Sequence, residues 1–189
     1  MKIIGNAIRP GMVIDHQGKL WRVAKISRSQ REQREAYTQA ELKDVRSGNK
    51  LIARFASQDT LERVRLDEKE YQFLFGDGDM YTFMDTESYE QVTVSAELIG
   101  EDQVPFLQEN MKVAIDLHEE RPIAVRLPDS VVLTVVEADP VTRGQTAASS
   151  YKPAVLENGV RTMVPPHIEA GSRIVVSTAD GAYVERAKG

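Results

Sequence analysis

The sequence predicts an all-β protein composed of three small β-barrel domains. Short segments rich in β-branched and aromatic residues recur along the 189-residue chain, separated by turn-forming residues roughly every ten positions. Net charge also changes in blocks: residues 1–64 carry +6, residues 65–128 carry −10 and residues 129–189 carry −1. These observations divide the chain into three domains of about 60 residues, each near the lower size limit for a self-sufficient core. A single β-sandwich is the alternative architecture.

In the first segment, strands are expected at residues 13–16, 20–26, 37–45 and 50–55. Residues 28–35 (RSQREQRE), between the second and third of these strands, contain no large apolar side chain. This predicts a hairpin whose cationic tip projects from the barrel and can reach a phosphate or a hydroxyl. The alternative is an exposed loop in which arginine and glutamate side chains neutralise each other.

In the second segment, residues 76–79 (GDGD) join two aromatic strands into a hairpin. They lack the spaced oxygen ligands and the terminal glutamate of a calcium loop. The strands of this segment are expected at residues 71–75, 80–84, 90–94, 112–117 and 122–127. Residues 96–107 are the one helical candidate, interrupted at Pro105.

In the third segment, a β-branched strand is followed by a long polar loop of small residues, 139–153. The strands are expected at residues 131–137, 162–164, 173–177 and 183–186. With these, the whole chain contains about fourteen short strands and very little helix.

Composition narrows the chemistry. The chain has no cysteine, and His16, His118 and His167 belong to no close-spaced ligand motif, so we expect neither a metal site nor a cofactor. No apolar run approaches the ~20 residues of a membrane-spanning helix. Residues 1–10 lack the features of a signal peptide, so we expect a cytoplasmic protein with no membrane partner.

Two function classes remain open from the residues alone. The acidic middle segment offers paired carboxylates that a hydrolase could use as acid and base, although a solvated acidic surface explains them as well. A ribosome-independent OB-fold RNA-binding protein, such as an RNA chaperone, would use exposed aromatic side chains. Aromatic residues make up only 6% of this chain, and many fall at expected core positions.

Several collinear motifs carry a family resemblance. They are IRPG at 8–11, GKLW at 18–21, LKDVRSG at 42–48, QFLF at 72–75, DGDMYTFMD at 77–85, GQTA at 144–147, SYKPA at 150–154, ENGV at 157–160 and YVER at 183–186. Over essentially its whole length the chain resembles bacterial elongation factor P, which is homologous to the hypusine-bearing translation factor of eukaryotes and archaea.

The resemblance implies a KOW/SH3-like barrel followed by two OB-fold barrels, in an L-shaped, tRNA-like arrangement. It implies a monomer that binds the 70S ribosome between the P and E sites and contacts P-site peptidyl-tRNA and ribosomal RNA. Such a factor is not an enzyme. It promotes peptide bond formation, and relieves stalling at consecutive prolines, by positioning the peptidyl-tRNA.

The resemblance also implies site residues. The tip that faces the tRNA and the peptidyl transferase centre corresponds to Arg31, Glu32, Gln33 and Arg34. Tyr183 and Arg186 match a pair that contacts RNA in the third domain. The loop expected to face the E-site codon contains Gly144, Gln145, Thr146, Ala147 and Ala148.

The tip departs from the family pattern. The family usually has Pro-Gly-Lys-Gly there, or a variant with arginine, and its central residue is commonly modified. Here Gln33 aligns with the modified position without a gap, and glutamine has no amine to accept a lysyl-type extension. We therefore expect the tip to work unmodified, or to work weakly. A natural unmodified variant, a divergent paralogue and an altered sequence are all compatible with this departure.

Overall fold

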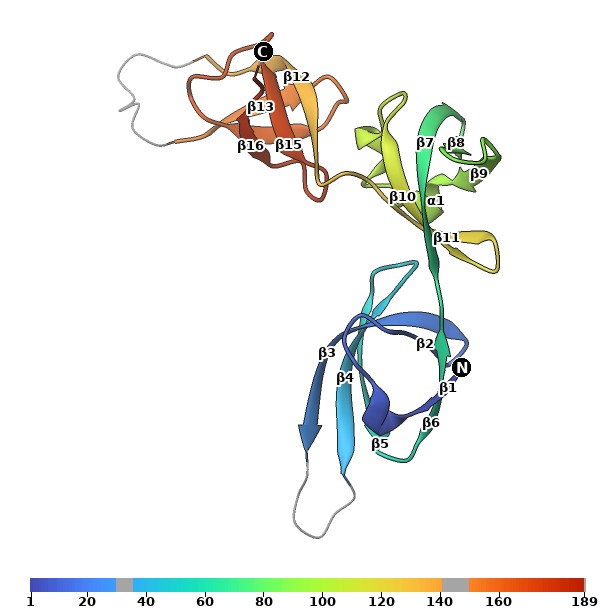
Figure 1. The fold of residues 1–189 in the computed structure, drawn as a ribbon. Coiled ribbons are helices and arrows are strands. Elements are labelled where there is room, and N and C mark those ends of the chain that lie inside the picture. The colour runs from blue at the N-terminus through green and yellow to red at the C-terminus, as the bar shows by residue number, and fades with distance from the viewer. Residues whose placement is uncertain (30–35, 141–149, 189) are drawn as a thin grey trace. The chain divides into compact units, whose positions relative to one another are not determined.

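The computed structural model describes residues 1–29, 36–140 and 150–188, and within them the chain is almost entirely β (Figure 1). These residues form sixteen strands and three short helical elements, arranged as one six-stranded and two five-stranded sheets. The predicted all-β class and the three barrels are confirmed. More strands form than expected from the sequence, because short pairing segments such as β1 carry too little alternation to be recognised.

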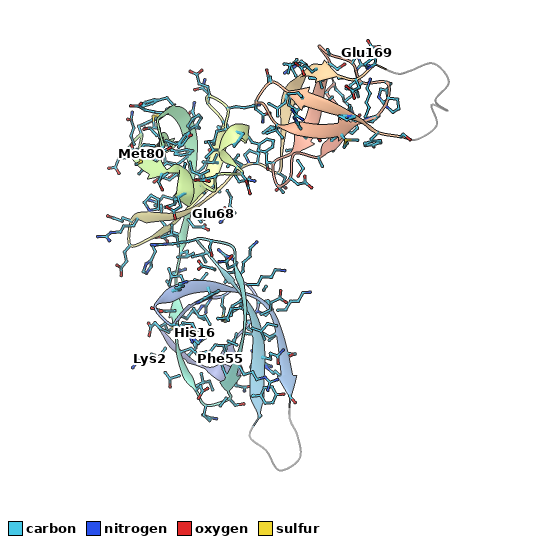
Figure 2. The ribbon with its side chains drawn as sticks, turned by 180° about the vertical axis from the view of Figure 1, so that it is seen from behind. Lys2, His16, Phe55, Glu68, Met80 and Glu169 are labelled. Atoms are coloured by element: carbon cyan, nitrogen blue, oxygen red, sulfur yellow. The ribbon has the colours of Figure 1, made fainter. Side chains whose placement is uncertain are left out.

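The first sheet has the strand order β1-β6-β2-β3-β4-β5. Its strands are β1 (Lys2–Ile4), β2 (Val13–His16), β3 (Lys19–Ser29), β4 (Tyr37–Asp44), β5 (Lys50–Ala56) and β6 (Thr60–Val64). Each pair of neighbouring strands is antiparallel. The sheet curls around a core that includes Ile14, Trp21, Leu42 and Phe55, with the ring of His16 edge-on to Phe55 at 5.3 Å (Figure 2).

The second sheet has the order β11-β10-β7-β8-β9. Its strands are β7 (Asp67–Asp77), β8 (Met80–Asp85), β9 (Gln91–Ser95), β10 (Lys112–His118) and β11 (Arg121–Arg126). The short helix expected at 96–107, with an interruption at Pro105, is confirmed only at its start: the segment holds α1 (Ala96–Ile99) and the 3-10 turn η2 (Val104–Phe106), and Pro105 lies inside η2. Gly100 separates them with a left-handed backbone, φ 100°, which ends α1 after one turn.

The third sheet has the order β14-β13-β12-β15-β16. Its strands are β12 (Ser130–Ala138), β13 (Lys152–Leu156), β14 (Arg161–Val164), β15 (Arg173–Ser177) and β16 (Tyr183–Arg186). Alternate residues of β12 and β15 point into an aliphatic core, as the β-branched composition of these strands predicts.

The segment containing η2 completes the third core. Phe106 is 3% exposed and belongs to the same buried cluster as Leu133, Leu156 and Ile174. Three side-chain hydrogen bonds fasten the segment: Gln103 Nε2 to Thr178 O (2.7 Å), Gln108 Nε2 to Val132 O (2.9 Å) and Asn158 Nδ2 to Pro105 O (3.1 Å). A barrel this small buries few apolar side chains of its own, so a neighbouring aromatic ring is a substantial addition.

By its internal contacts the chain forms two compact units, residues 1–69 with 115–125 and residues 70–114 with 126–189. The three sheets follow one another along the chain, whereas the units divide β7, β10 and β11 between them. The domain boundaries expected after residues 64 and 128 therefore stay a prediction.

One five-residue turn occurs in all three sheets, between β4 and β5, β8 and β9, and β15 and β16. The side chain of the last strand residue accepts a hydrogen bond from the backbone N–H two positions on, at 2.8, 2.8 and 3.3 Å respectively. The backbone N–H four positions on donates a hydrogen bond to the backbone carbonyl of the same strand residue, at 2.9, 2.9 and 2.8 Å. The starting residues are Asp44, Asp85 and Ser177. This repeat is hidden in the sequence, because Asp and Ser satisfy the same geometry.

The fourth position after the starting residue has a left-handed backbone in each turn. Glycine occupies it at Gly48 and Gly181, but Tyr89 occupies it in the second sheet with φ 64°. The Tyr89 side chain is 71% exposed, so packing contributes little to offset the strain.

Replacing Tyr89 with glycine is therefore expected to stabilise the protein by about 0.5–1 kcal/mol, because it removes the left-handed strain. The midpoint of thermal unfolding measures the change. Gly48→Ala, at the same position of the first turn, should destabilise by a similar amount. A lower midpoint for Tyr89→Gly would contradict the explanation.

Candidate nucleic-acid interface

The β3–β4 hairpin positions the predicted tip. Its pairing runs from Trp21 opposite Asp44 to Ser29 opposite Tyr37, with a bulge between Val23 and Lys25. The tip residues Arg31, Glu32, Gln33 and Arg34 lie outside the described residues. The described part of this hairpin ends at the pair Ser29 and Tyr37, which face each other across the ladder. Figure 1 shows β3 and β4 side by side up to that end.

A planar cationic array lies on the β4–β5 side of that hairpin. The Arg54 guanidinium lies over the Tyr37 ring, 5.1 Å from the centroid, and Arg54 Nε donates to Gln39 Oε1 at 3.2 Å. Gln39 and Arg54 are directly opposite each other in the ladder, which brings the three side chains together. A guanidinium held over an aromatic ring suits contact with nucleotides, because it offers a positive charge beside a ring that can stack on a base. Sequence reasoning missed this array, since only the register reveals that the residues are neighbours.

Tyr183 and Arg186 lie on the edge strand β16, three positions apart. In a regular strand they would point to opposite faces. A bulge between Val175 and Val176 changes this: Tyr183 pairs with Val176 and Arg186 pairs with Ile174, and both partners are buried core residues. Because paired residues share a face, the structure brings Tyr183 and Arg186 to the same face of the sheet.

Tyr183 is half-buried against the third core, whereas Arg186 is exposed. The Tyr151 ring stands edge-on to the Tyr183 ring, with centroids 6.4 Å apart and planes at 84°. Such pairs are worth about 0.5–1.5 kcal/mol beyond their burial, so Tyr151 orients Tyr183. Within the described part of the chain, Arg186 forms no ion pair. Sequence reasoning assigned no role to Tyr151, although it lies in the polar loop expected at 139–153 and in the SYKPA motif.

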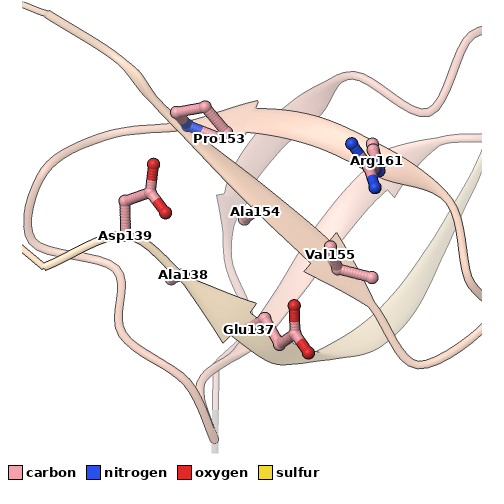
Figure 3. Close-up of a pocket in the computed structure, with 7 residues that line it drawn as sticks. All are labelled: Glu137, Ala138, Asp139, Pro153, Ala154, Val155 and Arg161. Atoms are coloured by element: carbon pink, nitrogen blue, oxygen red, sulfur yellow. The ribbon is translucent and has the colours of Figure 1, made fainter.

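That loop, with Gly144, Gln145, Thr146, Ala147 and Ala148, lies outside the described residues. A cavity of about 490 Å³ lies where its flanking strands begin and end, between the end of β12 and the strands β13 and β14. Figure 3 shows the carboxylates of Glu137 and Asp139 on one side of it and the Arg161 guanidinium on another. Two carboxylates oppose phosphate binding inside the cavity.

Among the described residues, Tyr71 and Glu62 have shifted pKa values, and both shifts have local causes. Burial raises the pKa of Tyr71, and the carboxylates of Asp85 and Glu90 raise it further. The N-terminal ammonium donates a 2.7 Å hydrogen bond to Glu62 and lowers the pKa of that carboxyl. Both shifts move the titration away from neutral pH, so neither prepares a general acid or base.

Within residues 1–29, 36–140 and 150–188, no group of three or more His, Cys, Asp or Glu side chains could hold a metal ion. A search of the same residues finds no helix long and apolar enough to cross a membrane.

Comparison with known protein families accounts for nearly the whole chain. Residues 5–61 match the family model of the elongation factor P KOW-like domain, residues 66–125 the elongation factor P OB domain, and residues 131–186 the elongation factor P C-terminal domain. The chain belongs to the elongation factor P family. Elongation factor P of Zymomonas mobilis is 54% identical over 187 residues, covering 99% of this chain and 100% of the relative. That of Rhodospirillum centenum is 53% identical over 188 residues, covering 100% of both.

Solved structures agree on the fold. Eukaryotic translation initiation factor 5A from Methanococcus jannaschii superposes with a TM-score of 0.55 at 17% identity, covering 68% of this chain and 94% of that structure. A translation initiation factor eif-5a family protein from Naegleria fowleri gives a TM-score of 0.54 at 12% identity, covering 67% and 98%. The resemblance to elongation factor P is thus confirmed, and the protein is a member of a translation factor family.

Proposed function

We propose that the protein binds the ribosome between the P and E sites and promotes peptide bond formation, relieving stalling at consecutive prolines. The observation that carries the proposal is the match to elongation factor P along 99% of the chain, at 54% identity and with complete coverage of the relative. All three domains of the family are therefore present.

The mechanism we infer is positional. Proline is a poor substrate because its ring restricts the backbone and the approach of its nitrogen. A factor that holds the peptidyl-tRNA in a reactive geometry lowers the entropic part of the barrier without supplying a nucleophile. The ribosome then performs the chemistry, and the protein acts as a non-enzymatic assistant in the cytoplasm.

Roles for individual residues follow from this placement. Arg31, Glu32, Gln33 and Arg34 would approach the CCA end of the P-site tRNA from the hairpin tip. Tyr183 would stack on or hydrogen-bond to RNA, and Arg186 would bind phosphate beside it, since both lie on one face of β16. The loop from Gly144 to Ala148 would face the E-site codon, where small residues permit close backbone approach.

A reconstituted translation reaction tests the function. The protein should raise the yield of a reporter containing three consecutive prolines several-fold, and leave a proline-free reporter unchanged, because only the first is limited by substrate positioning. Equal effects on both reporters, or none, would reject the proposal. An RNA chaperone would instead bind RNA without ribosomes and show no dependence on proline.

The contact assigned to Arg186 is tested with Arg186→Ala. Affinity for ribosomes carrying P-site tRNA should fall about tenfold, as expected for the loss of one charge-assisted hydrogen bond. Co-sedimentation measures the affinity, and thermal unfolding should be unchanged because Arg186 is exposed. Arg173→Ala is the matched control, because its neighbour Ile174 shares the face of Arg186 and Arg173 therefore points to the other face. Unchanged binding by Arg186→Ala would contradict the contact assigned to Arg186.

The tip is proposed to work without modification. The protein purified from its native cells should have the intact mass of the bare chain, since Gln33 offers no amine. Peptide mass spectrometry across residues 28–43 locates any added group. A modification on Arg31, Gln33 or Arg34 would overturn the proposal.

A further inference from the structure

Two arginines that are far apart in sequence converge on the same two backbone carbonyls. Arg9 Nη1 donates to Asn6 O at 3.1 Å and to Ile8 O at 2.9 Å. Arg28 Nη2 donates to Asn6 O at 3.0 Å and reaches Ile8 O at 3.5 Å. The two guanidinium nitrogens are therefore no more than two hydrogen-bond lengths apart.

The accepting carbonyls lie on a rigid support. The carbonyl of Asn6 lies in the 3-10 turn η1 (Gly5–Ala7), and that of Ile8 directly follows it. Two backbone hydrogen bonds hold this turn, from Gly5 N to Asp59 O at 2.8 Å and from Asn6 N to Ser57 O at 3.1 Å. A Cβ on Gly5 would collide with the carbonyl oxygen of Ala56, so only glycine permits this approach. Ile8 is completely buried. The guanidinium groups are thus oriented before any ligand arrives.

The charges of this pair are left uncompensated within the described residues. Both side chains are exposed, and neither forms an ion pair there. Each guanidinium has five N–H groups, of which the carbonyls engage those on one terminal nitrogen. Two like charges so close repel each other. An anion that bridges their outward N–H groups would attract both, so that the net electrostatic energy of the three groups becomes favourable.

We propose that Arg9 and Arg28 form a clamp for a backbone phosphate of RNA. A phosphate presents several oxygens to two guanidinium groups at once, and arginine binds phosphate in a bidentate manner. Arg28 lies on β3, one position before the last ladder pair, Ser29 with Tyr37. The clamp therefore lies beside the last described pair of the hairpin, close in the chain to the residues that the proposed function assigns to the tRNA. The net charge of +6 on residues 1–64 favours such a partner over an acidic protein surface of equal size.

This assignment rests on the proposed function but is tested without ribosomes. The full chain is titrated into a fluorescent RNA duplex with a single-stranded CCA end, and anisotropy is recorded at several salt concentrations. The double variant R9Q/R28Q should bind about tenfold more weakly than the wild type. The slope of log K against log salt should fall by about one, because one phosphate is no longer neutralised.

Matched variants distinguish phosphate binding by the clamp from the general effect of positive charge on RNA affinity. K43Q/R46Q removes the same charge from the opposite end of β4 and should change neither quantity beyond a small electrostatic effect. R9K/R28K retains the charge and should keep the salt slope while losing affinity, because an ammonium cannot donate in a fork. If R9Q/R28Q unfolds, R9K/R28K decides, and wild-type affinity in that variant overturns the clamp.

The clamp is also overturned if the wild type fails to bind the duplex, or if R9Q/R28Q and K43Q/R46Q behave alike. Neither result affects the proline reporter, which tests the function itself. Duplex binding that requires the clamp, together with a failed reporter, would leave the RNA site in place and reject the ribosomal role.

Discussion

The antiparallel pairing of β3 with β4 is the interaction on which the proposed activity depends. Its ladder continues to Ser29 and Tyr37, one pair beyond Thr38, which is buried opposite the core residue Phe55. The buried Thr38 side chain, the backbone hydrogen bonds of the ladder and the bond from Arg28 to η1 together hold the outer part of the hairpin. The end of a paired hairpin occupies a smaller range of positions than the end of an unpaired loop. The proposed mechanism, which holds the peptidyl-tRNA in place, requires such a small range.

In the third barrel, a bulge in the pairing of β15 with β16 determines which side chains share a face. The proposed RNA contact requires edge strand β16 to present an aromatic and a cationic side chain together, although their spacing in sequence would separate them. One unpaired residue opposite the Val175–Val176 step restores the common face. Tyr151 then fixes the ring of Tyr183 from the end of the adjoining loop. A bulge on an edge strand also discourages pairing with another chain.

Size is the limit that all three barrels share. The third core recruits Phe106 from a segment that precedes it, and polar side chains on both sides of that ring fix its approach. The same turn recurs in all three sheets. Its own side-chain hydrogen bond stabilises it, so the turn needs no packing against a core. Tyr89 shows that the geometry is enforced even where the residue is unfavourable.

The sequence by itself determined the β class, the three barrels and the family, because alternation, turn residues and collinear motifs are local properties of the chain. It also indicated Tyr183 and Arg186 as candidate RNA contacts, which stay a prediction. It also determined that Gln33 cannot carry the usual modification. It predicted one helix where Gly100 allows only a single turn. Only the tertiary structure decided that Tyr183 and Arg186 share a face, that the Tyr151 ring packs against Tyr183, and that Arg9 meets Arg28 on the carbonyls of Asn6 and Ile8. These juxtapositions depend on strand register and on a bulge, and a shift of one residue, which leaves composition and motifs untouched, would abolish every one of them.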